Sequence, residues 1–523
     1  MGIYLNSGNE NFKIAKNSKI YIDKSELISY TNSVLRTEQR YLCVSRPRRF
    51  GKSMTANMLA AYYSKEVDST ELFQDLKISQ NPSFAQHLNQ YNVIFLNMQS
   101  FFSRTNDVTA MQQLIEKSVL RDLRKTYPNV DYLDPDDLIS SLLDIYTETS
   151  DSFIFIIDEW DCIFREYKTD ADAQKLYLDF IRRLLKDQSY VSLAYMTGIL
   201  PIKKYGSHSA LNMFDEFSMA NPGPLAPFVG FTDSEVRELC TIHCMDFAEI
   251  KHWYDGYHFS NAVNIYNPRS VVSAMLTQSY DNFWNKTETF EALRDYIIMN
   301  YDGLKDAIIE LLAGARKKIN TNTFSNDMTT FHSADDVLTL LIHLGYLGYD
   351  FSTKEVYIPN SEISSEFYSA VSSTNWNTVI DSLKKSETLL NATINKNCKQ
   401  VASIIAETHM ETSILTYNDE NALSYTLSLA YYSAREYYIS FRELPTGHGF
   451  ADIVFIPRKH YPDKPALVIE LKWNKSAESA LKQIQDKHYT HSLESYTGKI
   501  LLVGINYNPQ TKEHQCIIEE HFK

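Results

Sequence analysis

Short apolar runs alternate with helical patterns over the first 230 residues of the chain. The apolar runs predict buried strands at residues 41–44, 93–96, 153–157 and 192–196. Apolar residues spaced three and four apart predict helices at residues 54–63, 107–126, 137–148 and 176–185. Strands that alternate with helices form parallel sheets whose two faces are covered. We therefore expect an α/β domain over residues 1–230.

The strand signals fade after residue 230, and helical spacing dominates the middle of the chain. Thr232 followed by Glu235 forms a capping box, which predicts the start of a helix. Two further helices and a small hairpin are predicted at residues 290–313, 334–344 and 346–357. We expect residues 231–375 to form a helical lid or a winged-helix-like domain.

Helices and strands mix again from about residue 376. Helices are predicted at residues 422–433 and 477–489, and strands at residues 436–442, 451–457, 466–472 and 499–504. The first strands follow one another closely, which indicates an antiparallel start, and the second helix separates the last two strands. We expect a small α/β domain over residues 376–523.

Composition and charge limit the classes of molecule that this protein is expected to bind. Lys and Arg total 51 and Asp and Glu total 65, which gives a formal net charge of −14 over 523 residues. This balance argues against broad, salt-driven binding to nucleic acid. Residues 401–523 hold 12 basic and 15 acidic residues, a net of −3, so the remaining −11 lies in residues 1–400. A small cutting site near the C-terminus is therefore compatible with the overall charge.

The sequence has no pattern typical of export or membrane insertion. The first 19 residues have no apolar core of the signal-peptide type. The longest apolar runs are far shorter than the roughly 18 residues that a membrane span needs. Six scattered cysteines form no disulfide framework, as expected in a reducing compartment. We expect a cytoplasmic protein without a membrane partner.

The segment that follows the first strand has the second half of a Walker A loop. It ends in Gly51-Lys52-Ser53 and opens the helix from Met54, where backbone N–H groups favour phosphate. Lys52 would reach the β- and γ-phosphates of ATP, and Ser53 would bind Mg²⁺. The first glycine of the pattern is replaced by Arg46, and the other loop residues are Pro47, Arg48, Arg49 and Phe50. The arginines would neutralise phosphate, reach a neighbouring subunit or form a solvated face.

The strand at residues 153–157 leads into a Walker B pattern. Asp158 would hold Mg²⁺ through water, and Glu159 would polarise the attacking water. The alternative is a strand followed by a helix cap, because Asp is a good N-cap residue. Thr197 ends the next apolar strand, where it would act as a sensor of the γ-phosphate or belong to an ordinary turn.

A second acidic group lies on the strands near the C-terminus. Glu470 and Lys472 share one face of their strand while Leu471 points into the core. Asp452 lies on the preceding strand, and two carboxylates are suitable ligands for one or two Mg²⁺ ions. With Lys472, and with Gln483 from the next helix, this set suits metal-assisted cleavage of phosphodiesters. The alternative is a same-face ion pair, and further candidate ligands are Glu420 and Glu443.

Taken together, these motifs resemble a bacterial family with an N-terminal AAA-ATPase-like domain and a C-terminal PD-(D/E)XK nuclease-like domain. The missing first glycine of the loop is typical of that family. The resemblance rests on residues 20–24, 46–53, 157–159, 197–198, 230–232, 253–257 and 266–268, and on Asp452, residues 470–472 and Gln483.

The resemblance implies a fold, two activities and a set of site residues. The fold would be an AAA-like P-loop sheet at the start and a restriction-endonuclease-like α/β domain at the end. It implies that Lys52, Ser53 and Asp158 bind ATP with Mg²⁺ and that Glu159 is the hydrolytic residue. It also implies that Asp452 and Glu470 bind metal and that Lys472 is the catalytic lysine.

The expected protein is an ATPase joined to a nuclease that acts on DNA or RNA, compatible with a homo-oligomer. By analogy alone, its role would lie in phage defence or mobile-element biology. Phe450 stands where a basic residue is expected, which would weaken contact with a nucleic-acid backbone. The alternative is therefore an ATP-switched binding or signalling module whose nuclease core is catalytically weak.

Overall fold

The computed structural model divides the chain into two compact units. The first contains Met1–Trp284 and Lys318–Asn360, and the second contains Asn285–Lys317 and Ser361–Lys523. The structure describes residues 2–521 except residues 203, 206–207, 210, 260–262, 285–289, 300, 327, 375, 412–426, 429, 447–448, 459–460, 487–495 and 497. The expected division into three domains remains a prediction. Among the described residues, no helix combines the length and the apolar character that crossing a bilayer requires.

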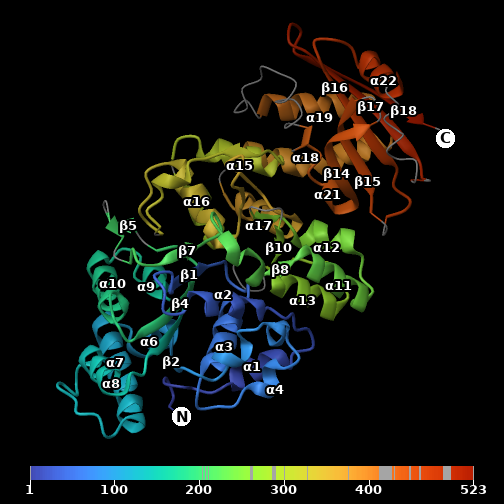
Figure 1. The fold of residues 1–523 in the computed structure, drawn as a ribbon. Coiled ribbons are helices and arrows are strands. Elements are labelled where there is room, and N and C mark those ends of the chain that lie inside the picture. Colours follow the sequence, from blue (N-terminus) through green and yellow to red (C-terminus); the bar gives the residue numbers. More distant parts are fainter. Residues whose placement is uncertain are drawn as a thin grey trace. The chain divides into compact units, whose positions relative to one another are not determined.

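A five-stranded parallel sheet forms the centre of the first unit (Figure 1). Its strands, in spatial order, are β2 (Asn92–Asn97), β3 (Phe153–Asp158), β4 (Val191–Gly198), β1 (Tyr41–Ser45) and β7 (Asp215–Phe217). The four predicted strands are confirmed. Every residue of β1, β3 and β4 is buried, as expected for strands covered on both faces. The edge strand β7 was missed because it is three residues long and begins with two acidic residues.

Helices cover both faces of this sheet. Figure 1 shows α1 and α3 on one side and α7, α8 and α10 on the other. The four predicted helices are confirmed, and three of them begin at an Asp whose side chain accepts a hydrogen bond from the first turn. The helices are α1 (Glu10–Lys16), α2 (Glu26–Val34), α3 (Lys52–Tyr63), α4 (Thr70–Phe73), α5 (Phe84–His87), α6 (Met98–Thr105), α7 (Val108–Thr126), α8 (Leu138–Thr149), α9 (Cys162–Glu166) and α10 (Ala171–Leu185).

The rest of the first unit combines helices with small antiparallel sheets. The predicted capping box of Thr232 and Glu235 is present at the start of α11. The helix predicted at 334–344 and the hairpin that follows it are also confirmed. Strands β8, β9 and β10 were missed because each has two to four residues. The elements are β8 (Phe231–Thr232), α11 (Asp233–His243), α12 (Phe247–Tyr254), β9 (Tyr257–Phe259), β10 (Val263–Tyr266), α13 (Pro268–Thr277), α16 (Ala334–Leu344), β12 (Gly348–Asp350) and β13 (Glu355–Tyr357).

Gly256 joins α12 to β9 at a position where no side chain fits. Its φ of 115° is one that glycine adopts readily, and a Cβ there would lie 2.0 Å from the carbonyl oxygen of Pro359. We expect Gly256→Ala to destabilise the chain by about 3 kcal/mol, seen as a lower urea midpoint by tryptophan fluorescence. Gly51→Ala is the control, because its Cβ meets open space at a φ of 94°. Equal losses in the two variants would contradict the steric argument.

The second unit contains a mixed five-stranded sheet. In spatial order the strands are β14 (Tyr438–Thr446), β15 (Gly449–Pro457), β16 (Ala466–Trp473), β17 (Ile500–Asn508) and β18 (Glu513–His521). The pairs β14–β15, β15–β16 and β17–β18 are antiparallel, and β16–β17 is parallel. The first four strands match the predicted ones and confirm the antiparallel start. The edge strand β18 was missed because it is largely polar.

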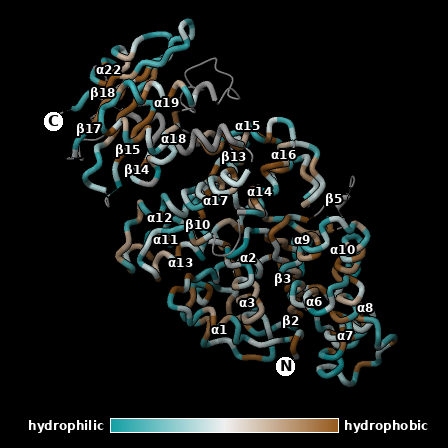
Figure 2. Tube along the Cα trace, turned by 180° about the vertical axis from the view of Figure 1, so that it is seen from behind, coloured by the Kyte–Doolittle hydropathy of each residue, from teal (hydrophilic) through white to brown (hydrophobic). Residues whose placement is uncertain are grey.

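Helices pack on both faces of this second sheet. Residues of α18 (Asn377–Ile394) and α19 (Cys398–Glu411) join one core with the sheet, and α22 (Ala477–Asp486) closes the other core. In Figure 2 hydrophobic colour is concentrated in the interior of this unit, and its outer loops are coloured as hydrophilic. Half of the predicted helix at 422–433 lies outside the described residues. The remaining helices are α14 (Phe290–Ile297), α15 (Leu304–Leu312), α17 (Ser361–Ser372) and α21 (Ala434–Tyr437).

Candidate functional site

The loop between β1 and α3 leads into the N-terminus of α3 through a left-handed glycine turn. Gly51 caps α3 with a left-handed φ of 94°, and Lys52 is the first residue of the helix. Glycine adopts this backbone conformation without steric strain, because it has no Cβ. The amide groups of the first helical turn have no partner within the helix, so they can bind an anion at its N-terminus.

Arg46 supports this loop from inside the protein. Its side chain is fully buried, and Nη1 donates to the carbonyl oxygens of Ser45 at 2.9 Å and Phe217 at 2.8 Å. Its guanidinium also lies 5.0 Å from the centre of the Phe259 ring. Burial lowers the pKa of Arg46 to about 10. Arg46 therefore is not part of a solvated face, whereas Arg48 and Arg49 are exposed.

Lys52 is held beneath the loop that precedes it. Its Nζ donates to the carbonyl oxygens of Arg46 and Pro47, both at 2.9 Å. Burial lowers the pKa of Lys52, and the carboxylates of Glu159, Asp161 and Asp158 oppose this shift. The ammonium group therefore lies in an acidic, buried environment at the base of the loop.

Asp158 ends β3 and is held by side chains from both neighbouring strands. Thr197 of β4 donates its hydroxyl to Oδ1, and Asn97 of β2 donates Nδ2–H to Oδ2 at 3.2 Å. These contacts form because the carboxyl ends of parallel strands meet at one edge of a sheet. Both Asp158 and Thr197 are buried. Thr197 thus contacts Asp158 rather than the adjoining cavity.

Glu159 directly follows Asp158, and its carboxylate has a different hydrogen-bond partner. Its φ of 56° lies in the left-handed region, which is uncommon for a residue with a side chain. Its Oε2 accepts a hydrogen bond of 2.5 Å from Nη2 of Arg165 in α9. Burial raises the pKa of Glu159, and the positive charges of Lys52 and Arg165 oppose that increase.

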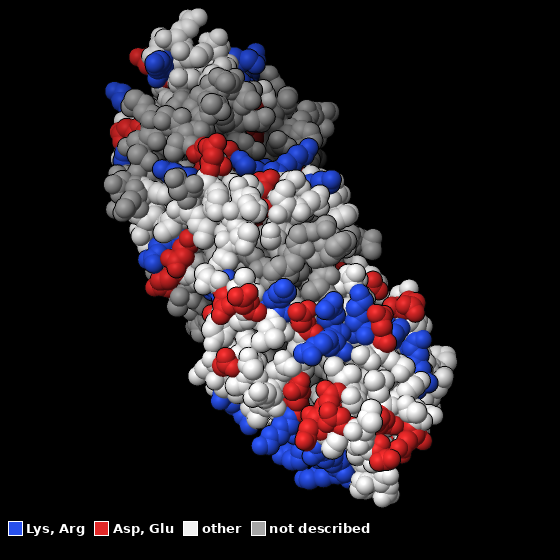
Figure 3. Space-filling model, turned by 90° about the vertical axis from the view of Figure 1, so that its left-hand side faces the viewer, with Lys and Arg blue, Asp and Glu red and all other residues white. Residues whose placement is uncertain are grey.

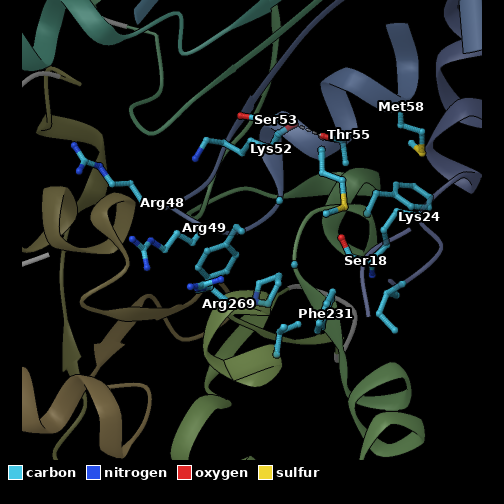
Figure 4. Close-up of a pocket in the computed structure, with 18 of the residues that line it drawn as sticks. Ser18, Lys24, Arg48, Arg49, Lys52, Ser53, Thr55, Met58, Phe231 and Arg269 are labelled. Atoms are coloured by element: carbon cyan, nitrogen blue, oxygen red, sulfur yellow. Dashed lines mark hydrogen bonds between the residues drawn. The ribbon is translucent and has the colours of Figure 1, made fainter. Parts of the chain in front are cut away.

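A cavity of about 840 Å³ adjoins the loop, and both charged and apolar side chains line it. Lys52, Ser53 and Glu159 are among its polar and charged lining residues, and Ile20 and Phe231 are among its apolar ones. Figure 4 shows Arg48, Arg49 and Arg269 on one side and Ser18, Lys24 and Met58 on the other. The residues predicted for nucleotide binding that line this cavity are Arg48, Arg49, Phe50, Gly51, Lys52, Ser53 and Met54. Those that do not line it are Arg46, Pro47, Asp158 and Thr197.

The second candidate site lies in the second unit, between β15, β16 and α22. Oδ2 of Asp452 accepts a hydrogen bond of 2.7 Å from the backbone N–H of Leu471. Oε1 of Glu470 accepts hydrogen bonds from Nζ of Lys472, at 2.8 Å, and from Nε2 of Gln483. Glu470 and Lys472 are buried. Glu470, Lys472 and Gln483 are therefore in direct contact, and Asp452 is hydrogen-bonded to the backbone of Leu471, which lies between Glu470 and Lys472 in the sequence.

The donor set of this site fits a divalent cation in its chemistry. Carboxylate oxygens are the ligands that Mg²⁺ prefers, and Asp452 and Glu470 supply two such groups. Within the described part of the chain, no group of three or more His, Cys, Asp or Glu side chains could hold a metal. A metal here would thus need further ligands from water or the backbone. Among the additional candidates, Glu420 lies outside the described residues, as do the side chains of Glu443 and Phe450.

Sequence reasoning did not single out Asn97 and Arg165. Asn97 directly follows a predicted strand that pairs with the Walker B strand, so the shared carboxyl edge was a usable signal. Arg165 lies four residues after Asp161, a spacing that brings side chains together on a helix. Neither signal by itself reveals that the two residues converge on the Asp158–Glu159 pair.

Three known proteins are similar to parts of this chain. A protein of Azotobacter chroococcum mcd 1, described as an uncharacterized protein in the vnfD 5′ region, is 21% identical over 290 residues. The aligned part is 53% of this chain and 52% of that protein, so the chain spans about half of its length. The structure of C. elegans PCH-2 is 13% identical, with a TM-score of 0.25 over 64% of this chain and 72% of that chain.

Another similar structure is the Aeropyrum pernix ORC2 protein in its ADPNP–ADP complexes, 11% identical with a TM-score of 0.26. That alignment covers 68% of this chain and 98% of that chain. Family models are more specific: residues 7–207 match the model described as a predicted AAA-ATPase, and residues 420–516 match the PD-(D/E)XK nuclease superfamily. The chain therefore carries an AAA-ATPase-like domain near its N-terminus and a PD-(D/E)XK nuclease superfamily domain near its C-terminus.

Proposed function

We propose that the first unit binds and hydrolyses ATP. The observation that carries this proposal is that Lys52, Ser53 and Glu159 line one cavity of about 840 Å³ at the N-terminus of α3, which apolar side chains such as Ile20 and Phe231 also line. The phosphates would lie at the N-terminus of α3, and the base against the apolar side chains. Hydrolysis of added ATP by the purified chain, measured as release of inorganic phosphate, tests the proposal.

The hydrolytic step uses this chain's own residues in distinct roles. Lys52 stabilises negative charge on the β- and γ-phosphates. This charge grows on the oxygen that bridges the two phosphates as the bond between that oxygen and the γ-phosphorus breaks. Glu159 accepts a proton from water as the water oxygen bonds to the γ-phosphorus. The bond between that phosphorus and the bridging oxygen breaks, and ADP and phosphate leave.

Ser53 and Asp158 are the residues that would hold the Mg²⁺ of a bound nucleotide. When bound, Mg²⁺ neutralises phosphate charge. A hydroxyl and a carboxylate suit this hard cation. The hydrogen bonds from Thr197 and Asn97 fix the orientation of the Asp158 carboxylate, which is the usual task of residues that contact metal ligands.

Thr197→Val tests the support of Asp158. The substitution keeps the shape of the side chain but removes the hydroxyl that donates to Oδ1. We expect the Mg²⁺ concentration for half-maximal ATP hydrolysis to rise about tenfold. Thr197→Ser keeps the hydroxyl and should behave as the wild type. An unchanged Mg²⁺ requirement in Thr197→Val would contradict the role of Asp158 as a metal ligand.

We further propose that the second unit cleaves nucleic acid in a metal-dependent reaction. Support comes from the buried cluster of Glu470, Lys472 and Gln483 beside Asp452. Asp452 and Glu470 would hold the cation, which supplies an activated water, and Lys472 would orient that water or stabilise charge on the phosphate. Figure 3 shows groups of basic and groups of acidic side chains on one face of the molecule. The net charge of −3 over residues 401–523 favours a compact cutting site over a broad electrostatic surface.

One observation favours a second candidate function, a nucleotide-switched binding module. The Glu470 carboxylate already accepts hydrogen bonds from Lys472 and Gln483, and these donors compete with a cation for the same oxygen. Incubation with single- and double-stranded DNA and RNA, with Mg²⁺ or Mn²⁺ and with or without ATP, separates the two functions. Cleavage supports the nuclease, and intact substrates under all conditions would favour the binding module.

A further inference from the structure

We propose that Arg165 is a positioning residue for ATP hydrolysis, which fixes the carboxylate of Glu159 at the wall of the cavity. The inference rests on the proposed ATPase function of this site. Arg165 and Glu159 both line the cavity, and Nη2 of Arg165 lies 2.5 Å from Oε2 of Glu159. Arg165 thus acts on the reaction through Glu159.

Arg165 is itself anchored from the protein interior. Its Nε lies 3.5 Å from Oδ2 of Asp161, whose side chain is fully buried. The same Oδ2 accepts hydrogen bonds from the backbone N–H groups of Ile199 at 3.0 Å and Leu200 at 2.9 Å. These amides follow β4 directly, so the end of the central sheet determines where Asp161 lies. A chain of contacts therefore runs from the sheet through Asp161 and Arg165 to Glu159.

Lys52, the neighbouring cation, does not position the Glu159 carboxylate as Arg165 does. Lys52 donates to two loop carbonyl oxygens, and among the described residues Arg165 is the hydrogen-bond donor to Glu159. In the described part of the chain, Oε1 of Glu159 accepts no hydrogen bond. One oxygen of the carboxylate is therefore held by Arg165, while the other is available to receive a proton from water.

The planar guanidinium is suited to hold two carboxylates at once. The Glu159 side chain is 24% exposed at the cavity, so it has room to rotate if Arg165 is removed. A displacement of about 1 Å in a reacting group can lower a rate about 10²-fold. Because Arg165 acts on Glu159 rather than on the nucleotide, its loss should affect turnover and leave binding intact.

The test is a comparison of kcat and KM for ATP in the full chain. Arg165→Gln should lower kcat about 10²-fold and change KM less than about twofold. Arg165→Lys keeps the charge and should recover part of the lost kcat. Arg182→Gln is the matched control, because Arg182 on α10 is about half-exposed and forms an ion pair with Asp179, and it should retain wild-type turnover.

A double variant shows whether Arg165 acts through Glu159. Glu159→Gln with Arg165→Gln should be no slower than Glu159→Gln alone, because the carboxylate that Arg165 positions is already absent. Additive losses, a raised KM or an unchanged or increased kcat in Arg165→Gln would overturn the inference while leaving the ATPase proposal intact. Absence of ATP hydrolysis by the wild-type chain would overturn the ATPase proposal, and the inference with it.

Discussion

Replacing Lys52 with Ala is expected to lower kcat/KM for ATP hydrolysis about 10³-fold, a loss of about 4 kcal/mol in transition-state stabilisation. Lys52 is buried at the start of α3, with Nζ 2.9 Å from two carbonyl oxygens of its own loop. Burial lowers its pKa, whereas three nearby carboxylates favour its charged form. On nucleotide binding, Nζ would exchange the weak carbonyl acceptors for charged phosphate oxygens, a stronger interaction. Alanine cannot supply this interaction.

The measurement is the initial rate of phosphate release over a range of ATP concentrations. Lys65→Ala is the control, since Lys65 belongs to the same unit and forms a half-exposed ion pair with Asp151 at 3.0 Å. It should retain wild-type activity. A Lys52→Ala variant that is folded by circular dichroism and hydrolyses ATP at the wild-type rate would contradict the proposed phosphate site.

The second large effect is expected in the C-terminal domain, where Lys472→Ala should reduce metal-dependent cleavage of nucleic acid about 10³-fold. Nζ of Lys472 lies 2.8 Å from Oε1 of Glu470, and both side chains are buried. The ammonium group therefore lies beside a proposed metal ligand, where it can orient water or stabilise charge on the phosphate. Removal of the ammonium group also leaves the negative charge of the buried Glu470 carboxylate without its positive partner, which lowers the stability of the fold as well as the activity.

A second variant separates these two effects. Asp452→Asn keeps an oxygen that can accept the hydrogen bond from Leu471 but removes the charge that a cation requires. It should lower cleavage to a similar extent while the fold is preserved. Lys499→Ala is the control, because Lys499 pairs with Glu520 at an exposed position on the same sheet. If the wild type cleaves nucleic acid and Asp452→Asn cleaves it equally well, the proposed metal site is wrong.

Much of the fold could be predicted because its signals are local. The buried strands of the central sheet are continuous apolar runs, and most of the helices between them show apolar spacing and Asp caps. The missed strands lack such signals: β7 has two acidic residues, and β18 alternates polar groups at a sheet edge. Helix α19 was also missed, although Val401, Ile404 and Ile405 have helical spacing and are buried.

The candidate sites were predictable only where the chemistry lies in consecutive residues. The turn at Gly51 and the pair of Asp158 and Glu159 are short segments whose backbone and neighbours are set by the sequence itself. Arg165 belongs to the same site, but its role depends on Asp161 and on amides that follow another strand. A reading of adjacent residues therefore singled out the loop before α3 and missed Arg165, which donates a hydrogen bond to Glu159.

The sequence by itself determined the parallel sheet, the glycine turn before α3, the acidic pair and the alternation that puts Glu470 and Lys472 on one strand face. Only the tertiary structure decided which of three similar arginines is buried, because Phe217 and Phe259, far along the chain, surround Arg46. It also decided that Gln483 reaches Glu470, since this contact requires α22 to pack on β16. Local motifs depend on backbone conformation and nearest neighbours, whereas contacts between distant segments depend on how whole elements pack.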